Sequence, residues 1–346
     1  MLLTVLGVAE VRARHSYVGW IVSCAGLNHD LGFDPVNGGM ELYFDRTGAM
    51  PPGLCPMQQH PYYGDALRSL GANVTCLSAR KHGVRVAHLQ LVKRRFGPVQ
   101  VRWVPRGPVW APGASGRDRH HVVDLLHKEA GVATGSIVAL ETPAELPLFA
   151  AAGYRALWTC QYVAELWLRD APEARLSAQS VKWRNRLRHA ERNDIEVAHR
   201  RFHPGRDAWL LQAETAQRRA RRYRTLPAAF TTAWARLHPN ATRLFVAHRQ
   251  GRIIAAMLFL RHPPTASYHI GWSDTEGRKY SAHNLLLWRA ANWLAVQGCQ
   301  RLDLGTVDSE NAPGLARFKL GSGAALRPLG PTMLRLPGLA RRRIAA

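Results

Sequence analysis

Three side chains that can transfer protons lie in or just after two segments that the residue pattern predicts to be strands. His269 lies in the predicted strand 267–272, and the ordinary pKa of histidine makes it a candidate general base near neutral pH. Asp303 lies near the carboxyl end of the predicted strand 301–305, and Asp308 follows in the next loop. Either carboxylate could accept a proton from an amine. Structural roles stay open, since a lone strand histidine is often simply packed and aspartate also favours turns.

The same strand carries two aromatic residues that we expect to contact a substrate, Tyr268 and Trp272. Strict alternation along a strand would place them on one face with Ile270, and would place His269 and Gly271 on the other.

A predicted helix begins directly after this strand and could hold an anion at its first turn. Asn284 opens the helix 284–296, and Arg278 and Lys279 precede it. Free N–H groups at a helix N-terminus bind anions, and the two cations add positive charge. A simple N-cap role for Asn284 is the alternative.

The chain is strongly basic, with 47 Lys and Arg against 24 Asp and Glu and a formal net charge of +23. A predicted helix near 177–192, with Ser177 as its N-cap, carries two cationic stripes. Their members are Arg184, Arg188 and Arg192 in one, and Lys182, Arg186 and His189 in the other. Such surfaces attract polyanions, and we take Lys182 and Arg186 as candidate substrate contacts. A solvated basic face is the alternative interpretation.

Other common site chemistries have no sequence signal. The five cysteines form no C-x-x-C pair, which argues against a disulfide framework and a zinc site. The histidines show no ligand-type spacing, so we expect no metal. No G-x-S-x-G motif is present, and no apolar run is long enough to span a bilayer.

The elements that position these residues occur twice. A hairpin at 74–92, a strand at 99–104, a helix at 120–130 and a strand at 136–141 predict one α/β module. The second module has its hairpin at 244–261 and is followed by the segments described above. We divide the chain into an uncertain extension (1–50), an N-terminal half (51–170), a C-terminal half (171–335) and a basic tail (336–346).

Three segments together resemble the Fem-type peptidyltransferases and their relatives in the GNAT acetyltransferase superfamily. The first, 268–308, is similar to the family's strand, "N-x-L-L-x-W" helix and "G-x-x-x-x-D-x-G" strand. The second, 316–323, reads ARFKLGSG and is similar to its F-K-x-G-F-G segment. The third, 181–197, is similar to its basic helix-to-strand passage, and 106–110 (RGPVW) fits the N-terminal half.

The resemblance covers roughly residues 55–335 and implies two tandem GNAT-like halves of mixed α/β structure. It also implies attack by an amine on an activated acyl group. Lys319, in the matched second segment, is the implied cation beside a phosphate or oxyanion. Ser322 departs from the family, which usually has an aromatic residue there, and the helical insert at 208–237 is too short for the tRNA-binding arm of some members.

Three hypotheses follow. One is an aminoacyl-tRNA-dependent transferase that modifies a cell-wall precursor or another nucleotide-linked amine. Another is an acyl-CoA-dependent N-acyltransferase, although RKYSAH at 278–283 lacks the glycines of the phosphate-cradling pattern expected for acetyl-CoA. The last is a non-enzymatic protein that binds nucleic acid or a membrane surface. We expect a cytoplasmic protein with an anionic donor or acceptor substrate.

Overall fold

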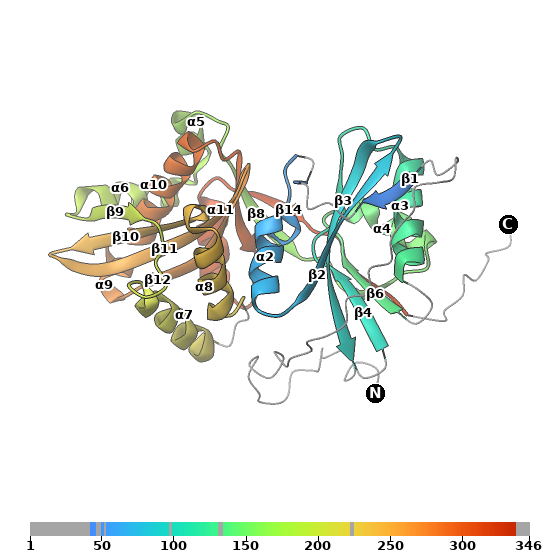
Figure 1. Cartoon of the computed structure of the whole chain (residues 1–346). Coiled ribbons are helices and arrows are strands. Elements are labelled where there is room, and N and C mark those ends of the chain that lie inside the picture. Colours follow the sequence, from blue (N-terminus) through green and yellow to red (C-terminus); the bar gives the residue numbers. More distant parts are fainter. Residues whose placement is uncertain are drawn as a thin grey trace.

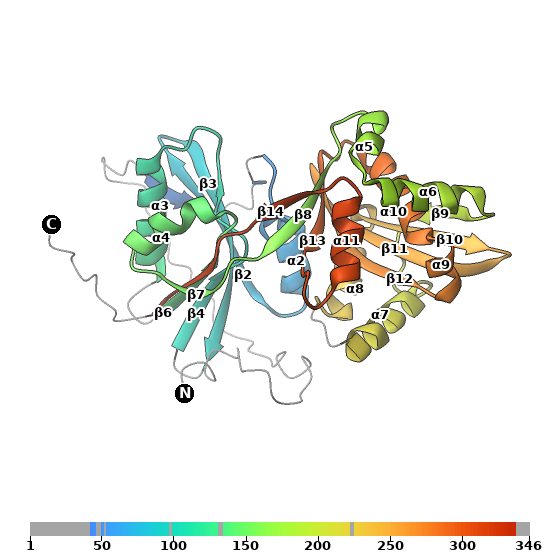
Figure 2. The same ribbon diagram turned by 180° about the vertical axis from the view of Figure 1, so that it is seen from behind.

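The computed structural model describes residues 42–45, 50–51, 53–96, 99–130, 134–221 and 225–336. They form two mixed β-sheets with helices around them, seen from opposite sides in Figures 1 and 2. The mixed α/β class predicted from the sequence is confirmed. Among the described residues, no helix is both long enough and apolar enough to cross a bilayer.

The first sheet has the order β1-β2-β3-β4-β6-β15-β7, with β5 paired to β3. Its strands are β1 (Leu42–Asp45), β2 (Asn73–Lys81), β3 (Val84–Phe96), β4 (Val99–Val104), β5 (Val109–Trp110), β6 (Thr134–Ala139), β7 (Arg155–Trp158) and β15 (Thr332–Arg335). Helices α3 (Gly116–Ala130) and α4 (Leu146–Ala151) contribute Val122, Leu126 and Phe149 to its core.

The second sheet has the order β14-β8-β13-β12-β11-β10-β9. Its strands are β8 (Tyr162–Trp167), β9 (Glu196–Arg200), β10 (Thr242–Arg249), β11 (Arg252–His262), β12 (Thr265–Ser273), β13 (Arg301–Thr306) and β14 (Ala325–Pro328). Its helices are α5 (Pro172–Ala178), α6 (Val181–Arg192), α7 (Ala208–Arg221), α8 (Ala228–Leu237), α9 (Thr275–Lys279), α10 (Ala282–Val296) and α11 (Pro313–Gly321).

Both faces of the second sheet are covered by helices. On one face, Leu187 of α6 and Leu286 of α10 pack against the strands. On the other face, Leu210 of α7 and Ala235 of α8 do so. This double cover explains why β11 is an almost unbroken apolar run rather than an alternating one.

The predicted repeat is confirmed, because β2, β3, β4, α3 and β6 follow one another as β10, β11, β12, α10 and β13 do. The predicted start of the basic helix is wrong. Ser177 belongs to α5, and α6 begins at Val181 after Ser180, whose Oγ accepts a hydrogen bond from the Trp183 N–H at 3.3 Å.

The two halves are joined by strands and by a shared apolar cluster. β15, near the end of the chain, returns to the first sheet between β6 and β7, and β8 enters the second sheet beside β13 (Figure 2). Helix α2 (Pro61–Ser69) packs on α8, where Tyr63 meets Phe230 and Trp234 in one cluster. The division at residue 170 stays a prediction. The extension up to residue 41 and the tail from residue 337 lie outside the described residues.

Candidate active site

The second sheet opens between two parallel strands. β12 and β13 pair at only three positions, Thr265 with Arg301, Ala266 with Leu302 and Ser267 with Asp303. Beyond them β12 continues beside β11 as far as Ser273, while β13 pairs with β8 through Thr306. The strands therefore diverge, and among the described residues no strand pairs with this edge of β12 beyond Ser267. Backbone N–H groups on such an edge can donate to a bound ligand.

A β-bulge at His269 lies where the divergence begins. Leu258 pairs with Ile270 and Phe259 pairs with Tyr268, which leaves His269 as the extra residue on β12. A bulge bends its strand and interrupts the alternation of side chains. The predicted alternation is therefore wrong for part of β12, because the bulge places Tyr268 and Ile270 on opposite faces.

Tyr268 now packs with the core on the α10 face, while Ile270 and Trp272 join the cluster on the α7 face. The Tyr268 hydroxyl occupies the space that a Cβ on Gly271 would need, so a larger residue at position 271 would force the Tyr268 ring to move. Trp272 packs edge-on to Trp209. Both aromatic residues therefore have packing contacts, and their substrate contacts stay a prediction.

Lys319 of α11 reaches the end of β13 on the other side of the divergence. Its Nζ donates to the Thr306 carbonyl oxygen at 2.7 Å and lies 3.7 Å from the ideal Cβ position of Gly305. The side chain is 5% exposed. Burial lowers the pKa of Lys319 to about 8 despite the opposing effect of Asp303. The ammonium form dominates at pH 7, so a cation stands beside the open strand end.

The Asp303 carboxylate binds two partners. Its Oδ2 lies 2.6 Å from Nη1 of Arg106, and its Oδ1 accepts from the Gly305 N–H at 2.7 Å. Burial opposes ionisation of Asp303, but the ion pair with Arg106 outweighs it and holds the pKa below its ordinary value. Asp303 is therefore ionised and arranges the Gly305 turn.

Arg106 belongs to the first half, so this contact joins the halves at the site. Its guanidinium also binds Glu141 at 2.8 and 3.0 Å. Arg327 bridges Glu141 and Glu165, and Arg301 lies 3.2 Å from Glu165. Arg106 adopts a left-handed φ of 50°, which costs about 1–2 kcal/mol for a non-glycine residue. The surrounding charge-assisted hydrogen bonds offset this strain.

The remaining candidate proton acceptors have defined local roles. The Nε2 atom of His269 lies 2.7 Å from Thr231 Oγ1, and burial lowers the pKa of His269 to about 4. His269 is therefore neutral at physiological pH and is a weak base. Asp308 is exposed and accepts from the N–H groups of Glu310 and Asn311, which lowers its pKa. Both remain candidates by position.

The first turn of α10 faces the end of β12 and has no side-chain cap. Ser281, its N-cap residue, has a left-handed φ of 57° and makes no capping hydrogen bond. Asn284 is buried, and its Nδ2 has no hydrogen-bond partner among the residues that the structure describes. Arg278 is exposed and donates to the Ser273 carbonyl oxygen, which holds it near this turn. An anion could therefore be bound here by backbone and guanidinium donors.

Lys182 and Arg186 lie on the exposed face of α6, away from Trp183, whose indole N–H donates to the Phe318 carbonyl oxygen of α11. The structure shows no contact between these two cations and Lys319.

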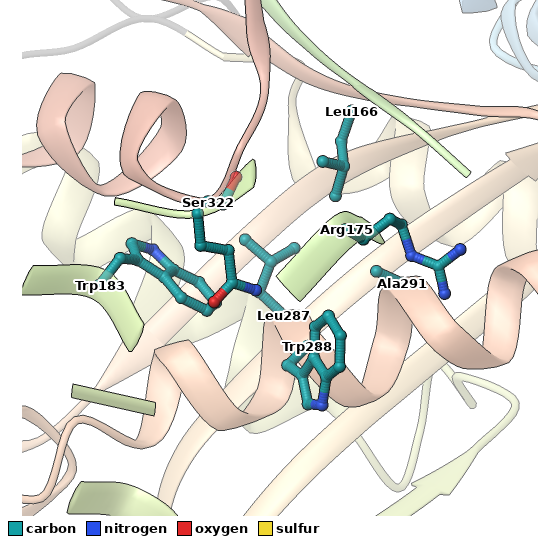
Figure 3. A pocket seen from close by; sticks show the side chains of 8 residues that line it. Leu166, Arg175, Trp183, Leu287, Trp288, Ala291 and Ser322 are labelled. Carbon is teal, nitrogen blue, oxygen red and sulfur yellow. The ribbon is translucent and has the colours of Figure 1, made fainter. Parts of the chain in front are cut away.

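A small pocket lies outside this region, between α5, α6, α10 and β8 (Figure 3). It is lined by Leu166, Arg175, Gln179, Trp183, Leu287, Trp288, Ala291 and Ser322. Arg175 binds the carbonyl oxygen of Leu168 and the side chain of Asn292, so it ties α5 to the sheet and to α10.

Sequence reasoning named Lys319 and Asp303 as candidates but missed the direct partners that hold them, and their catalytic roles stay predictions. Arg106 was noted only within its Gly-Pro motif, and Thr306 and Gly305 carried no signal beyond the end of a strand. Within the described residues, no group of three potential metal ligands is found.

Comparison with known proteins identifies the class of enzyme. Residues 178–320 match the family model described as the acetyltransferase (GNAT) domain. This span contains α6, β9–β13, the divergence and Lys319. The chain thus carries a GNAT acyltransferase domain and is an acyltransferase. No curated protein matches the chain.

Solved structures resemble the whole two-sheet arrangement. FemX aligns with a TM-score of 0.70 and 12% identity, over 84% of this chain and 94% of its own. L-PGS from Bacillus licheniformis aligns with a TM-score of 0.52 and 14% identity, over 84% and 89%. The C-terminal domain of a putative lysylphosphatidylglycerol synthetase from Agrobacterium fabrum aligns with a TM-score of 0.51 and 15% identity, over 80% of this chain and 88% of its own. At these identities the likeness establishes the fold, and it confirms the resemblance to Fem-type and GNAT proteins inferred from the sequence.

Proposed function

We propose that this enzyme transfers an acyl group to an amine at the divergence of β12 and β13, with Lys319 as the cation nearest the reacting carbonyl. The observation that carries the proposal is the opening between the two strands, with the His269 bulge on one side and the Lys319 ammonium on the other. Backbone N–H donors and a fixed cation are what a developing oxyanion requires.

In the proposed reaction the amine nitrogen forms a bond to the acyl carbon, and the bond between that carbon and the oxygen or sulfur of the donor breaks. The proton released by the amine ends on the departing donor group. Asp308 and His269 are the candidates to relay it, Asp308 because it is an exposed carboxylate and His269 because it is neutral. Lys319 stabilises the negative oxygen throughout.

The donor is proposed to be anionic and to bind at the uncapped first turn of α10. Arg278 and Lys279 are exposed there, and the buried amide nitrogen of Asn284 has no partner in the described parts of the chain. Acyl-CoA is supported by the match to the GNAT domain.

An aminoacyl-tRNA donor is the second candidate, with a cell-wall precursor as acceptor. Residues 278–283 lack the glycines that let a pyrophosphate approach the backbone, and Ala282 in the first turn is fully buried. The exposed cations Lys182 and Arg186 on α6 suit a longer polyanion. Both donors are made in the cytoplasm, where we place the enzyme.

A thermal-shift and transfer assay with a panel of donors tests the proposal. Acetyl-CoA, a longer acyl-CoA, an aminoacyl-tRNA and a nucleotide-linked wall precursor would each be added to the wild type and to Lys319→Ala. A ligand at a hundred times its Kd should stabilise the fold by about 2.7 kcal/mol. Stabilisation and transfer with one donor identify it, and we expect transfer to be lost in Lys319→Ala. Transfer at an undiminished rate in that variant would contradict the proposal.

A further inference from the structure

A second candidate site lies on the same helix as the proposed donor site but toward its other end. A groove between β9 and α10 is lined by Ile195, Val197, His199, Phe245, Arg289 and Trp293. Both views show β9, β10 and α10 side by side (Figures 1 and 2). Asn284 and Trp293 are nine residues apart on α10, or about 14 Å along the helix axis.

Side-chain alternation concentrates apolar and aromatic groups in this groove. Val197 and His199 point to the same face of β9, and Phe245 points to that face from β10, where the ring of His199 stacks on it at 5.0 Å. Trp293 closes the groove from α10, 5.5 Å from His199. Phe245 is buried, while His199 is exposed, so the His199 ring is available to a ligand.

Two arginines outside the groove lining, Arg243 and Arg261, gather around Trp293, one of the lining residues. Arg243 lies over the Trp293 ring at 4.1 Å, and Arg261 lies over the same ring at 5.3 Å. Their Nε atoms are buried, and no described residue accepts a hydrogen bond from them. In the part of the chain that the structure describes, no ion pair to a carboxylate involves either of them, Arg201 or Arg289.

This grouping is unfavourable in the free protein. Burial lowers the pKa of Arg243, and the neighbouring charges of Arg261 and Arg201 lower it further. Like charges brought together without counter-charges raise the energy of the folded state, and a bound anion would lower it. The carboxylates elsewhere are paired instead, as Asp207 is with Arg200.

We propose that this groove, which we call the Trp293 groove, binds a nucleotide, with its base against His199 and the apolar wall and its phosphate on Arg243 and Arg289. A base offers a flat π-face that stacks on aromatic rings and guanidinium groups. Phosphate accepts the charge-assisted hydrogen bonds that these arginines can donate. The nucleotide is either free or part of a single RNA strand, and this proposal does not depend on the proposed acyl transfer.

The shape of the groove favours a nucleotide over a lipid headgroup. Its large apolar side chains form the wall, and Phe245 is only 1% exposed. A membrane-binding surface would present apolar side chains outward so that they enter the bilayer. A bare anion would use the arginines but leave the aromatic wall without a role.

Binding would be measured by calorimetry at low salt with the full-length protein. The probes are AMP, ribose 5-phosphate, inorganic phosphate, a short single-stranded oligoribonucleotide and vesicles that contain an anionic phospholipid. We expect AMP to bind more tightly than ribose 5-phosphate, and each of Arg243→Gln and Arg289→Gln to raise its Kd by about tenfold. Arg117→Gln on α3, which removes an equally charged exposed residue, should leave the Kd unchanged.

Two arms distinguish the sources of the nucleotide. Tight binding of AMP alone supports a free nucleotide, and a much lower Kd for the oligoribonucleotide supports an RNA strand. Melting curves confirm that each variant is folded, and Arg289→Gln is the safer one because Arg289 is exposed. The proposal is overturned if AMP and ribose 5-phosphate bind equally or not at all. It is also overturned if only the vesicles bind, or if both groove variants bind AMP as the wild type does.

Discussion

The two halves contain the same strand–helix–strand unit, but only one of them is open. In the first half, the parallel strands β4 and β6 pair at five positions, from Gln100 with Thr134 to Val104 with Val138. In the second half, the corresponding strands β12 and β13 pair at three positions and then diverge. The first unit is therefore a closed sheet, and the second leaves backbone groups available to a ligand.

The first turns of the corresponding helices also differ, because that of α3 is capped and that of α10 is not. At the start of α3, the N–H of Asp118 donates to Ser115 Oγ at 3.1 Å, and the Asp118 carboxylate accepts from Ser115 and pairs with Lys81. A carboxylate in the first turn neutralises the positive end of the helix dipole. The first turn of α10 contains no acidic residue, and Ser281 does not cap it. A repeated fold therefore need not repeat its site, because the anion site that we propose at α10 also depends on an uncapped helix and a divided sheet.

Acid should destabilise the first half through its buried histidines. His60 and His88 are fully buried in or beside the first sheet, and burial lowers the pKa of each to about 4. In the unfolded chain these histidines bind protons below pH 6.5. Their contribution to stability is therefore complete above that pH and is lost as the pH falls toward 4. Each histidine should lower the free energy of unfolding by about 3 kcal/mol at pH 4.

Urea unfolding between pH 7 and pH 4 would measure this loss. His88→Leu should remove one histidine's share of the pH dependence, whereas His120→Gln, a change at an exposed histidine, should remove none. Equal slopes for both variants would show that acid does not act through the buried ring.

Removing Arg106 should damage the junction that supports the open unit. Arg106→Ala leaves the buried carboxylate of Asp303 without its ion-pair partner, and we expect the free energy of unfolding to fall by about 3–5 kcal/mol. The double variant Arg106→Leu/Asp303→Leu should regain part of this loss, because it removes both charges. A loss below about 1 kcal/mol in Arg106→Ala, measured by chemical denaturation, would mean that the contact is not structural.

The pH dependence of kcat would show whether Lys319 acts in the open unit as a charged ammonium. The pKa of Lys319 is about 8, so its ammonium is the dominant form below that pH. If the cation stabilises the oxyanion, kcat should fall by about tenfold per pH unit above pH 8. A profile that rises steadily through pH 9 would indicate that the neutral amine acts instead.

The caps of the two helices should respond differently to the same substitution. Ser115→Ala removes a hydroxyl that accepts a hydrogen bond from the first turn of α3 and should cost about 1 kcal/mol. Ser281→Ala removes a hydroxyl that caps nothing and should cost less than about half as much. Similar losses in thermal unfolding would remove the contrast between the closed and the open helix.

The sequence was sufficient to predict the repeated unit and the class of reaction. Gly83 and Gly251 mark the hairpins, and the apolar spacing of 284–296 marks α10. Lys319 was chosen as a candidate because its segment resembles one of the family. The match to the GNAT domain supports that resemblance for the domain as a whole.

Features that depend on pairing between distant strands were not predictable. The exchange of β8 and β15 involves short strands whose partners lie far away in the chain. The bulge at His269 depends on its register with β11, so strict alternation gave the wrong face for part of β12. Arg106 and Asp303 are 197 residues apart, and no local pattern links them.

The most direct test compares two lysines, one from each unit, in an acyl-transfer assay with the donor that the panel identifies. Lys319→Met removes the cation beside the open strands, and Lys81→Met removes the half-buried lysine that pairs with Asp118 at the closed unit. Our account predicts that kcat falls by about 10²–10³ in Lys319→Met and stays near the wild-type value in Lys81→Met. Equal rates in the two variants, with both folded, would contradict the claim that the divergence of β12 and β13 is the site of transfer.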